Sequence, residues 1–581
     1  MSRSGRATRW MTLVAMAALG CPSSPTAPAP AAAKTESVAK PPPATKKKSE
    51  RRTPRLVVLV VVDQMRADYL DRFRSLFDDG LARLLREGAR FTSAEIAHAV
   101  TMTSPGHATL STGAHPRHHG VIQNDWVERA TTSPTYAAGD PSRTIVGPAG
   151  ADTSTLEGRS PRSLRRATIG QWLRKASPTS KVMAIGFKDR STLLLAGMEA
   201  DGAYWYEPSL AGYVSSSVYG GALPPWVLAF DASGAVDREF GAPWERTLAA
   251  ERYNFVGADA VAAEGDGVEV SFPHRLDQGE GDSRAIYHKK LGTSPIGDAL
   301  TLELASAALG EAGLGDDDAP DLLLLTLSSA DLIGHAYGPE SHEIVDYYVR
   351  LDRRLGDLLR SLDAAVPGAY VVALTSDHGA APLPELARER GALAERVISA
   401  DFDAAVGRAL AAARRRVGLR APFPILDEDE ALWFDLRDAG EVDAAALRAA
   451  AAAELVKLPF VAAAYTYEEL AGAPAETSDP LLRRYRLSFD AERSPDIQLR
   501  AQPGWLINTR PRGTSHGSPY DYDSRVPLIF FGAGIPRGEH PEPVKTVDVA
   551  PTLAELLGVT PTEPVDGTSL LPLIGGGARR P

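Results

Sequence analysis

Six aspartate and histidine residues and one threonine have the types and spacing of a metal-assisted hydrolytic site. Asp331 and His335 are separated by three residues, and Asp377 and His378 are adjacent. Hydrolytic zinc binds histidine nitrogen and carboxylate oxygen, and two such ions can bind the attacking and leaving oxygens of one displacement. Each residue alone is weak evidence, but their joint occurrence predicts a metal site. The candidate metal ligands are Asp63, Asp331, His335, Asp377, His378 and His516.

The candidate nucleophile is Thr103, in the segment Thr-Ser-Pro-Gly-His that ends at His107. Ser104 and Pro105 are typical of a first helical turn, where proline is tolerated. A helix N-terminus favours a bound phosphoryl group. A threonine hydroxyl is a poor nucleophile unless a base or a metal ionises it. The alternative is that Thr103 only caps the helix.

Continuous apolar runs predict the elements that position these residues. Such runs are typical of parallel strands buried on both faces, and helical stretches lie between them. We therefore predict an α/β fold with a largely parallel central sheet between helices. In such sheets ligands bind at the carboxyl ends of the strands, where most of these runs lead to metal-binding residues. The runs are 56–62, 181–187, 322–327, 370–374 and 526–531.

Helices are predicted over 341–362, 444–455 and 549–557. Two stretches interrupt the α/β pattern, about 195–295 and about 383–505. We expect both to be inserted cap subdomains of one catalytic domain spanning 55–575.

The motifs resemble the alkaline phosphatase superfamily, and more narrowly its phosphodiesterase/nucleotide-pyrophosphatase-type branch. The resemblance covers 55–575 and implies two Zn²⁺ ions. It implies that one ion is bound by Asp331, His335 and His516, and that Thr103 faces the other. That other ion would be bound by Asp63, Asp377 and His378. Sulfatases share this architecture but require a modified Cys or Ser and a following Arg, where this chain has Thr103 and His107.

Three further residues bear on the substrate. Asn124 matches an asparagine that contacts a phosphoryl oxygen across this branch. Lys188 and Arg190 follow a predicted strand, and on an extended chain they point to the same side. The combination resembles the phosphate-irrepressible alkaline phosphatases, which implies binding of a small-molecule phosphate monoester and release of phosphate. A phosphodiesterase on the same metals is the nearest alternative, and an inactive ligand-binding surface lipoprotein is a remote one.

The N-terminus predicts export. Basic residues precede a short apolar run, 11–19, which is followed by Gly20 and Cys21, as in a bacterial lipoprotein signal over 1–21. We expect lipid attachment at Cys21, a Pro/Ala/Lys-rich tether over 22–54 and a periplasmic or cell-surface location. The alternative is a plain secretory signal. Cys21 is the only cysteine, which excludes an intrachain disulfide and a thiolate zinc site, and the net charge of -11 argues against nucleic-acid binding.

Overall fold

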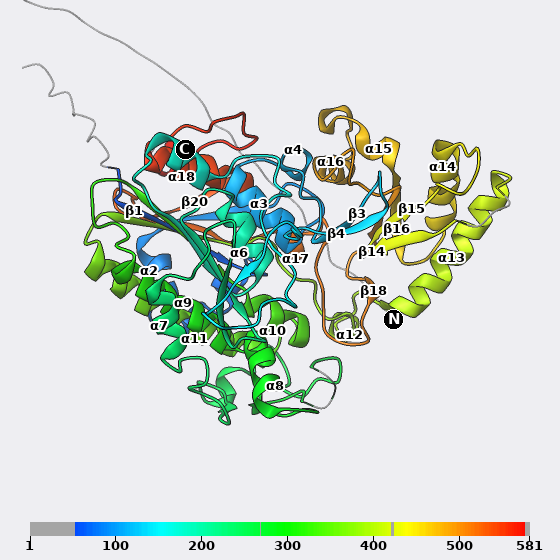
Figure 1. Ribbon diagram of the computed structural model, residues 1–581. Helices are drawn as coiled ribbons and strands as arrows, with labels where there is room; N and C mark the ends of the chain where they lie inside the picture. The colour runs from blue at the N-terminus through cyan, green and yellow to red at the C-terminus, as the bar shows by residue number, and fades with distance from the viewer. Residues whose placement is uncertain (1–52, 266, 268, 420–422, 576–581) are drawn as a thin grey trace, which may run out of the picture. The chain divides into compact units, whose positions relative to one another are not determined.

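The computed structural model describes residues 53–575 except 266, 268 and 420–422. The expected signal, Cys21 and nearly all of the tether lie outside the described residues. Among the described helices, none is long and apolar enough to cross a bilayer. Figure 1 shows the arrangement of the elements.

A ten-stranded sheet organises the chain. Its centre is β1 (Leu56–Val62), which pairs in parallel with β11 (Asp321–Leu327) on one side and β12 (Tyr370–Thr375) on the other. Parallel pairing continues from β11 to β6 (Val182–Gly186) and β7 (Gly202–Glu207). Four of the five apolar runs therefore form parallel strands, as predicted.

The fifth run forms a strand of opposite direction. β19 (Leu528–Gly532) lies between β12 and β2 (Ala89–Glu95) and is antiparallel to both. The sheet ends on this side with β20 (Gly538–Lys545), parallel to β2. At the other edge, β8 (Gly212–Ser216) is antiparallel to β7 and pairs with β5 (Ile145–Val146).

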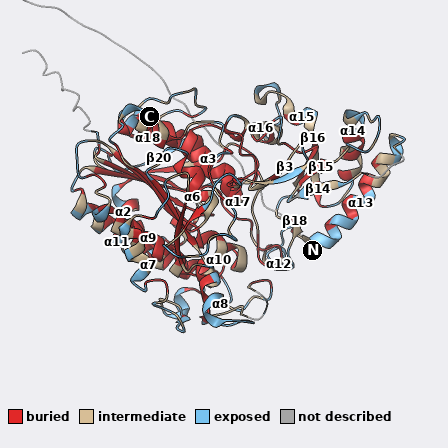
Figure 2. Ribbon diagram, in the orientation of Figure 1, coloured by how far each residue is buried: buried red, intermediate tan, exposed pale blue. Residues whose placement is uncertain are grey.

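Helices cover both faces of the sheet, and its central strands β1, β6, β11 and β12 are buried along their whole length (Figure 2), whereas the edge strand β20 is largely exposed. Alternate residues of β1 belong to two separate apolar cores, as strand geometry requires. One core includes α2 (Gly80–Glu87), α9 (Pro295–Glu311) and α11 (His342–Ala365). The other includes α3 (Thr103–Thr112), α5 (Ile169–Ala176), α6 (Asp189–Ala196) and α18 (Val549–Leu557). Burial on both faces explains the continuous apolar runs.

The two expected insertions differ in character. The first, about 195–295, begins with β7 and β8, which are strands of the central sheet. That part is therefore not a cap. The rest includes α7 (Pro225–Ala232), the β9–β10 ladder (Pro243–Trp244 and His274–Arg275) and α8 (Ser283–Lys290).

The region expected as the second insertion, about 383–505, contains its own sheet and core. The strand order is β14 (Ile425–Glu428), β15 (Ala431–Phe434), β17 (Ile497–Ala501) and β16 (Val461–Thr466). Two helices, α13 (Ser399–Arg416) and α14 (Ala444–Leu455), share its apolar cluster. The cluster is separate from the two cores of the central sheet. α14 and α18 have the predicted bounds, and α11 differs from its prediction by a few residues.

Candidate active site

Five of the six candidate metal ligands follow the carboxyl ends of central strands. Asp63 comes directly after β1, and Asp377 and His378 come after β12. Asp331 and His335 lie on α10 (Ser329–Tyr337), which follows β11. Their i,i+4 spacing places both on one face of that helix.

The six residues form two groups in which the candidate ligand atoms lie within 4.8 Å of one another. The first ligand group is Asp63, Asp377 and His378, and the second ligand group is Asp331, His335 and His516. His516 joins from the loop after β18 (Leu506–Thr509). This is the division that the family resemblance implied.

The two groups adjoin each other. The His378 and His516 rings stack with their centroids 3.6 Å apart. The Lys188 ammonium bridges the groups, at 2.8 Å from Asp63 Oδ2 and 2.5 Å from Asp331 Oδ2. A buried cation of this chain thus lies between the two sets of carboxylates.

The hydrogen bonds of the three histidine rings determine which ring nitrogen in each ligand group can accept. His378, His335 and His516 each place Nδ1 at 2.8–3.0 Å from a backbone carbonyl oxygen, which can only accept. In a neutral ring, Nδ1 therefore carries the proton and Nε2 carries a lone pair. His378 Nε2 faces Asp63 Oδ1 at 3.2 Å, and His335 Nε2 faces Asp331 Oδ1 at 3.3 Å. Lone pairs that face carboxylates need a cation between them, so both groups fit a metal ion.

Where no metal ion is bound, the same carboxylates favour a proton on the His378 and His335 rings instead. Burial lowers the pKa of His378, but the Asp377 carboxylate raises it, and the result is a pKa of about 9. Burial raises the pKa of Asp331, but neighbouring His335 lowers it well below its ordinary value. The Asp331 carboxylate therefore stays ionised, and its negative charge favours a cation in the site.

Thr103 is fully buried at the first position of α3, as its sequence context predicted. Its Oγ1 lies 3.4 Å from His378 Nε2, which places the hydroxyl beside the first ligand group. His107 fixes the start of the helix, because its Nδ1 donates to the Thr103 carbonyl at 2.9 Å and lies 3.1 Å from Asp377 Oδ2. The hydroxyl is thus positioned by the same residues that form the metal group.

Asn124 has one end of its amide fixed. Its Oδ1 accepts a hydrogen bond from the Ser104 backbone N–H at 2.9 Å. The amide oxygen is thus used by the helix that carries Thr103, and the Nδ2 group can donate to another partner. This orientation suits an amide that donates to an anion at the helix start.

Lys188 and Arg190 reach the site by a different backbone path from the one predicted. Lys188 is the N-cap of α6 and Arg190 is the second residue of that helix, so the extended-chain argument was wrong. The Arg190 guanidinium lies against Tyr136 and Asp189, and together these groups raise its pKa although burial lowers it. Tyr136 in turn donates to Asp189 Oδ1 at 2.5 Å. Arg190 therefore stays charged at the helix start.

Gln64 is a site residue that the sequence did not indicate. Its Nε2 donates to Asp331 Oδ1 at 2.6 Å, and its backbone N–H donates to Asp377 Oδ1 at 3.2 Å. One residue thus contacts both ligand groups. It adopts the left-handed conformation, with φ of 65°, that few residues other than glycine adopt.

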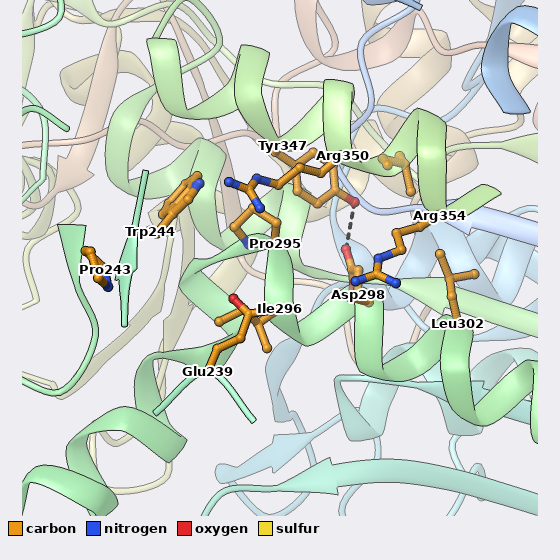
Figure 3. A pocket seen from close by; sticks show the side chains of 12 residues that line it. Glu239, Pro243, Trp244, Pro295, Ile296, Asp298, Leu302, Tyr347, Arg350 and Arg354 are labelled. Atoms are coloured by element: carbon orange, nitrogen blue, oxygen red, sulfur yellow. Dashed lines mark hydrogen bonds between the residues drawn. The ribbon is translucent and has the colours of Figure 1, made fainter. Parts of the chain in front are cut away.

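Asp298 is a second such residue. It accepts from the backbone N–H groups of Ser328 and Ser329, at 2.8 and 2.9 Å, and so supports the start of α10. Figure 3 shows the third bond, from the Tyr347 hydroxyl at 2.7 Å. Asp298 also lines a cavity of about 80 Å³ that none of the predicted site residues borders.

Fold and site together define a hydrolase with a paired metal-ligand set beneath a helix-borne threonine. The family model for type I phosphodiesterase / nucleotide pyrophosphatase matches residues 57–523. The chain belongs to this family. It is 31% identical over 546 residues to alkaline phosphatase PafA of Elizabethkingia meningoseptica, covering 90% of this chain and 95% of that protein. Alkaline phosphatase PhoV of Synechococcus elongatus is 32% identical over 517 residues, covering 87% of this chain and 90% of that protein.

Solved structures agree. The crystal structure of wild-type PafA matches with a TM-score of 0.82 at 32% identity, over 90% of this chain and 99% of that one. A PafA variant matches with a TM-score of 0.81, and it has one threonine, one asparagine, one lysine and one arginine replaced. In that protein the asparagine follows the threonine by 21 residues and the arginine follows the lysine by two. Thr103, Asn124, Lys188 and Arg190 have the same spacings.

Proposed function

We propose that the chain is an extracytoplasmic zinc-dependent phosphomonoesterase, an alkaline phosphatase that acts through a phosphothreonine at Thr103. The observation that carries the proposal is the position of the Thr103 hydroxyl, 3.4 Å from His378 of the first ligand group, which itself adjoins the second ligand group. The alkaline phosphatases among the relatives support the same reaction class.

Two Zn²⁺ ions suit the residues present. Each ligand group offers histidine nitrogen and carboxylate oxygen and no sulfur, which is the donor set of hydrolytic zinc. Bound zinc would lower the pKa of an attached hydroxyl or water and neutralise charge on phosphoryl oxygens. Lys188 would then lose its two carboxylate partners to the metal ions, and its ammonium would be available to a substrate oxygen.

The reaction takes place in two displacements. Thr103 loses its hydroxyl proton to solvent, its Oγ1 forms a bond to phosphorus, and the ester P–O bond breaks. The leaving alkoxide takes a proton from water and departs as an alcohol. Water then attacks the phosphothreonine, the Oγ1–phosphorus bond breaks, and Thr103 regains a proton as phosphate leaves. The α3 N-terminus favours the phosphoryl group throughout.

Lys188 and Arg190 favour a monoester over a diester, and Asn124 suits a phosphoryl oxygen of either ester. Asn124 Nδ2 donates to one phosphoryl oxygen, and Lys188 and Arg190 bind the additional charged oxygen that a monoester has and a diester lacks. In a buried site these charges have more effect than at a surface. A phosphodiesterase or nucleotide pyrophosphatase on the same metals is the alternative.

Export and lipid attachment at Cys21 belong to the same proposal. They are supported by the signal-like segment 1–21 and the tether-like composition of 22–54. In this arrangement the catalytic domain works outside the cytoplasm, held near a membrane by the lipid.

A matched panel of aryl phosphate mono- and diesters tests the proposed activity. With zinc supplied, kcat/KM for the monoester should exceed that for the diester with the same leaving group. A preference for the diester would replace the phosphomonoesterase with the phosphodiesterase. No turnover of either ester by protein loaded with zinc would favour the inactive surface lipoprotein.

A further inference from the structure

A cavity of about 740 Å³ opens from the second ligand group. Asp331 and His335 line it on the inner side, with Arg190. Its outer wall includes Asp429, from the turn between β14 and β15, and Arg510 from the loop after β18. The cavity therefore connects the metal-ligand residues with the region that carries the separate four-stranded sheet.

The leaving group of an ester should occupy this cavity. The Thr103 hydroxyl lies beside the first ligand group, 3.4 Å from His378. In an in-line displacement the leaving oxygen lies opposite the nucleophile, which here is the side of the second ligand group. Asp331 and His335 of that group border the cavity, so the alcohol part of the ester extends into it.

The outer wall is positively charged. Arg510 and Arg512 both line the cavity and are both exposed. Arg512 Nε donates to the Ala262 carbonyl at 3.2 Å, which ties that side chain to the first insertion. The Arg510 guanidinium, by contrast, makes no hydrogen bond or ion pair with any residue that the structure describes. Of the cavity-lining residues, three are arginines, Arg190, Arg510 and Arg512, and two are carboxylates, Asp331 on the inner side and Asp429 on the outer wall.

The backbone that carries Arg510 is fixed. The Arg396 guanidinium donates to the Arg510 carbonyl at 3.1 Å and to the Gly513 carbonyl at 2.8 Å. Nearby, Asn508 Nδ2 donates to the Asp429 carbonyl at 2.8 Å. Asn508 and Asp429 both adopt left-handed backbone conformations, with φ of 52° and 53°. Such conformations persist where surrounding contacts enforce them, so the wall is a built surface.

We propose that Arg510 forms a second anion subsite, which recognises phosphate monoesters whose alcohol part carries a carboxylate or another phosphate. The substrate class is thus the doubly anionic phosphate esters, such as phosphorylated hydroxy acids and sugar bisphosphates. The inference rests on the proposed phosphomonoesterase activity and refines its substrate. Arg510 binds the distal anion, while Lys188 and Arg190 bind the phosphoryl group that is transferred.

Matched substrate pairs test the subsite with the zinc-loaded enzyme. Phosphoglycerate against glycerol phosphate tests a distal carboxylate, and glucose bisphosphate against glucose phosphate tests a distal phosphate. One charge-assisted hydrogen bond is worth roughly tenfold in affinity. Arg510→Ala should therefore lower kcat/KM for the doubly anionic member of a pair about tenfold and leave the singly anionic member within about twofold. Arg510→Lys should restore part of the preference.

Two controls separate the subsite from other causes. Arg537→Ala removes an exposed arginine that does not line the cavity, and it should leave both ratios unchanged. Calorimetric binding of phosphoglycerate and glycerol phosphate to zinc-loaded Thr103→Ala, with and without Arg510→Ala, measures the same preference without turnover. Normal hydrolysis of glycerol phosphate with an unchanged ratio in Arg510→Ala would overturn the subsite alone. Absence of any hydrolysis would overturn the proposed function, and calorimetry would still decide the subsite.

Discussion

The contact between Gln64 and Gly334 predicts a pair of substitutions whose effects do not add. A Cβ placed on Gly334 would lie 1.8 Å from Gln64 Oε1, and Gln64 contributes all three of the nearest atoms. Gly334→Ala should therefore displace the Gln64 amide from Asp331 Oδ1, which it contacts at 2.6 Å. A hydrogen bond to a charged group contributes about 1.5–3 kcal/mol. Its loss should weaken zinc binding at the second ligand group about 10- to 100-fold.

Competition with a fluorescent chelator measures that zinc affinity in Gln64→Ala, Gly334→Ala and the double variant. Each single variant should show the loss, and the double variant should be no worse than either, because alanine at position 64 removes the clash. Gly407→Ala is the matched control, since Gly407 lies in α13 with no neighbour in the path of a Cβ. It should leave zinc affinity unchanged. If the double variant lost zinc affinity by the product of the two single losses, the positioning role of Gln64 would be refuted. Wild-type zinc affinity in Gly334→Ala would refute it as well.

Four further outcomes follow from the site. Thr103→Ala should remove nearly all turnover at unchanged zinc content, and Thr103→Ser should keep part of it; near-normal turnover in the alanine variant would indicate direct attack by water. Lys188→Ala and Arg190→Ala should each lower monoester kcat/KM about 10²–10³-fold and affect diesters far less; equal losses on both esters would remove the basis for the monoester assignment. Chelation should abolish phosphatase activity and zinc should restore it, whereas full activity of metal-free protein would contradict metal dependence. Cys21→Ala should prevent labelling of the protein with fatty acid, and an unlabelled wild type would show that Cys21 is incidental.

The ligand groups could be predicted because their positions follow from local pattern. Asp63, Asp331 and Asp377 each follow an apolar run, and parallel strands bring the ends of such runs to one edge of the sheet. The division into two groups, with His516 in the second, is the one that the family resemblance implied. Helices with capping residues and strong periodicity, such as α11, could be predicted from the sequence in the same way.

What the sequence did not predict depends on tertiary contacts. The apolar run that forms β19 is the same pattern for either strand direction, so only its neighbours determine that it is antiparallel. Arg190 lies in the first turn of a helix where an extended segment was expected, since a short polar stretch after a strand fits either. Gln64 follows Asp63 with no periodic signal, and its role comes from a left-handed backbone and partners some 270 and 310 residues away.

The position of β19 also limits when the fold can be completed during synthesis. Both sheet neighbours of β2 come from the last part of the chain, β19 from residue 528 and β20 from residue 538 of 581. A ribosome that adds about 5–20 residues per second leaves β2 without either partner for tens of seconds. An unpaired strand edge is a template for aggregation. Until the C-terminal strands are synthesised, β2 must therefore be kept from pairing with other chains. A chain cut before residue 528 lacks both partners of β2 and should accumulate as aggregate.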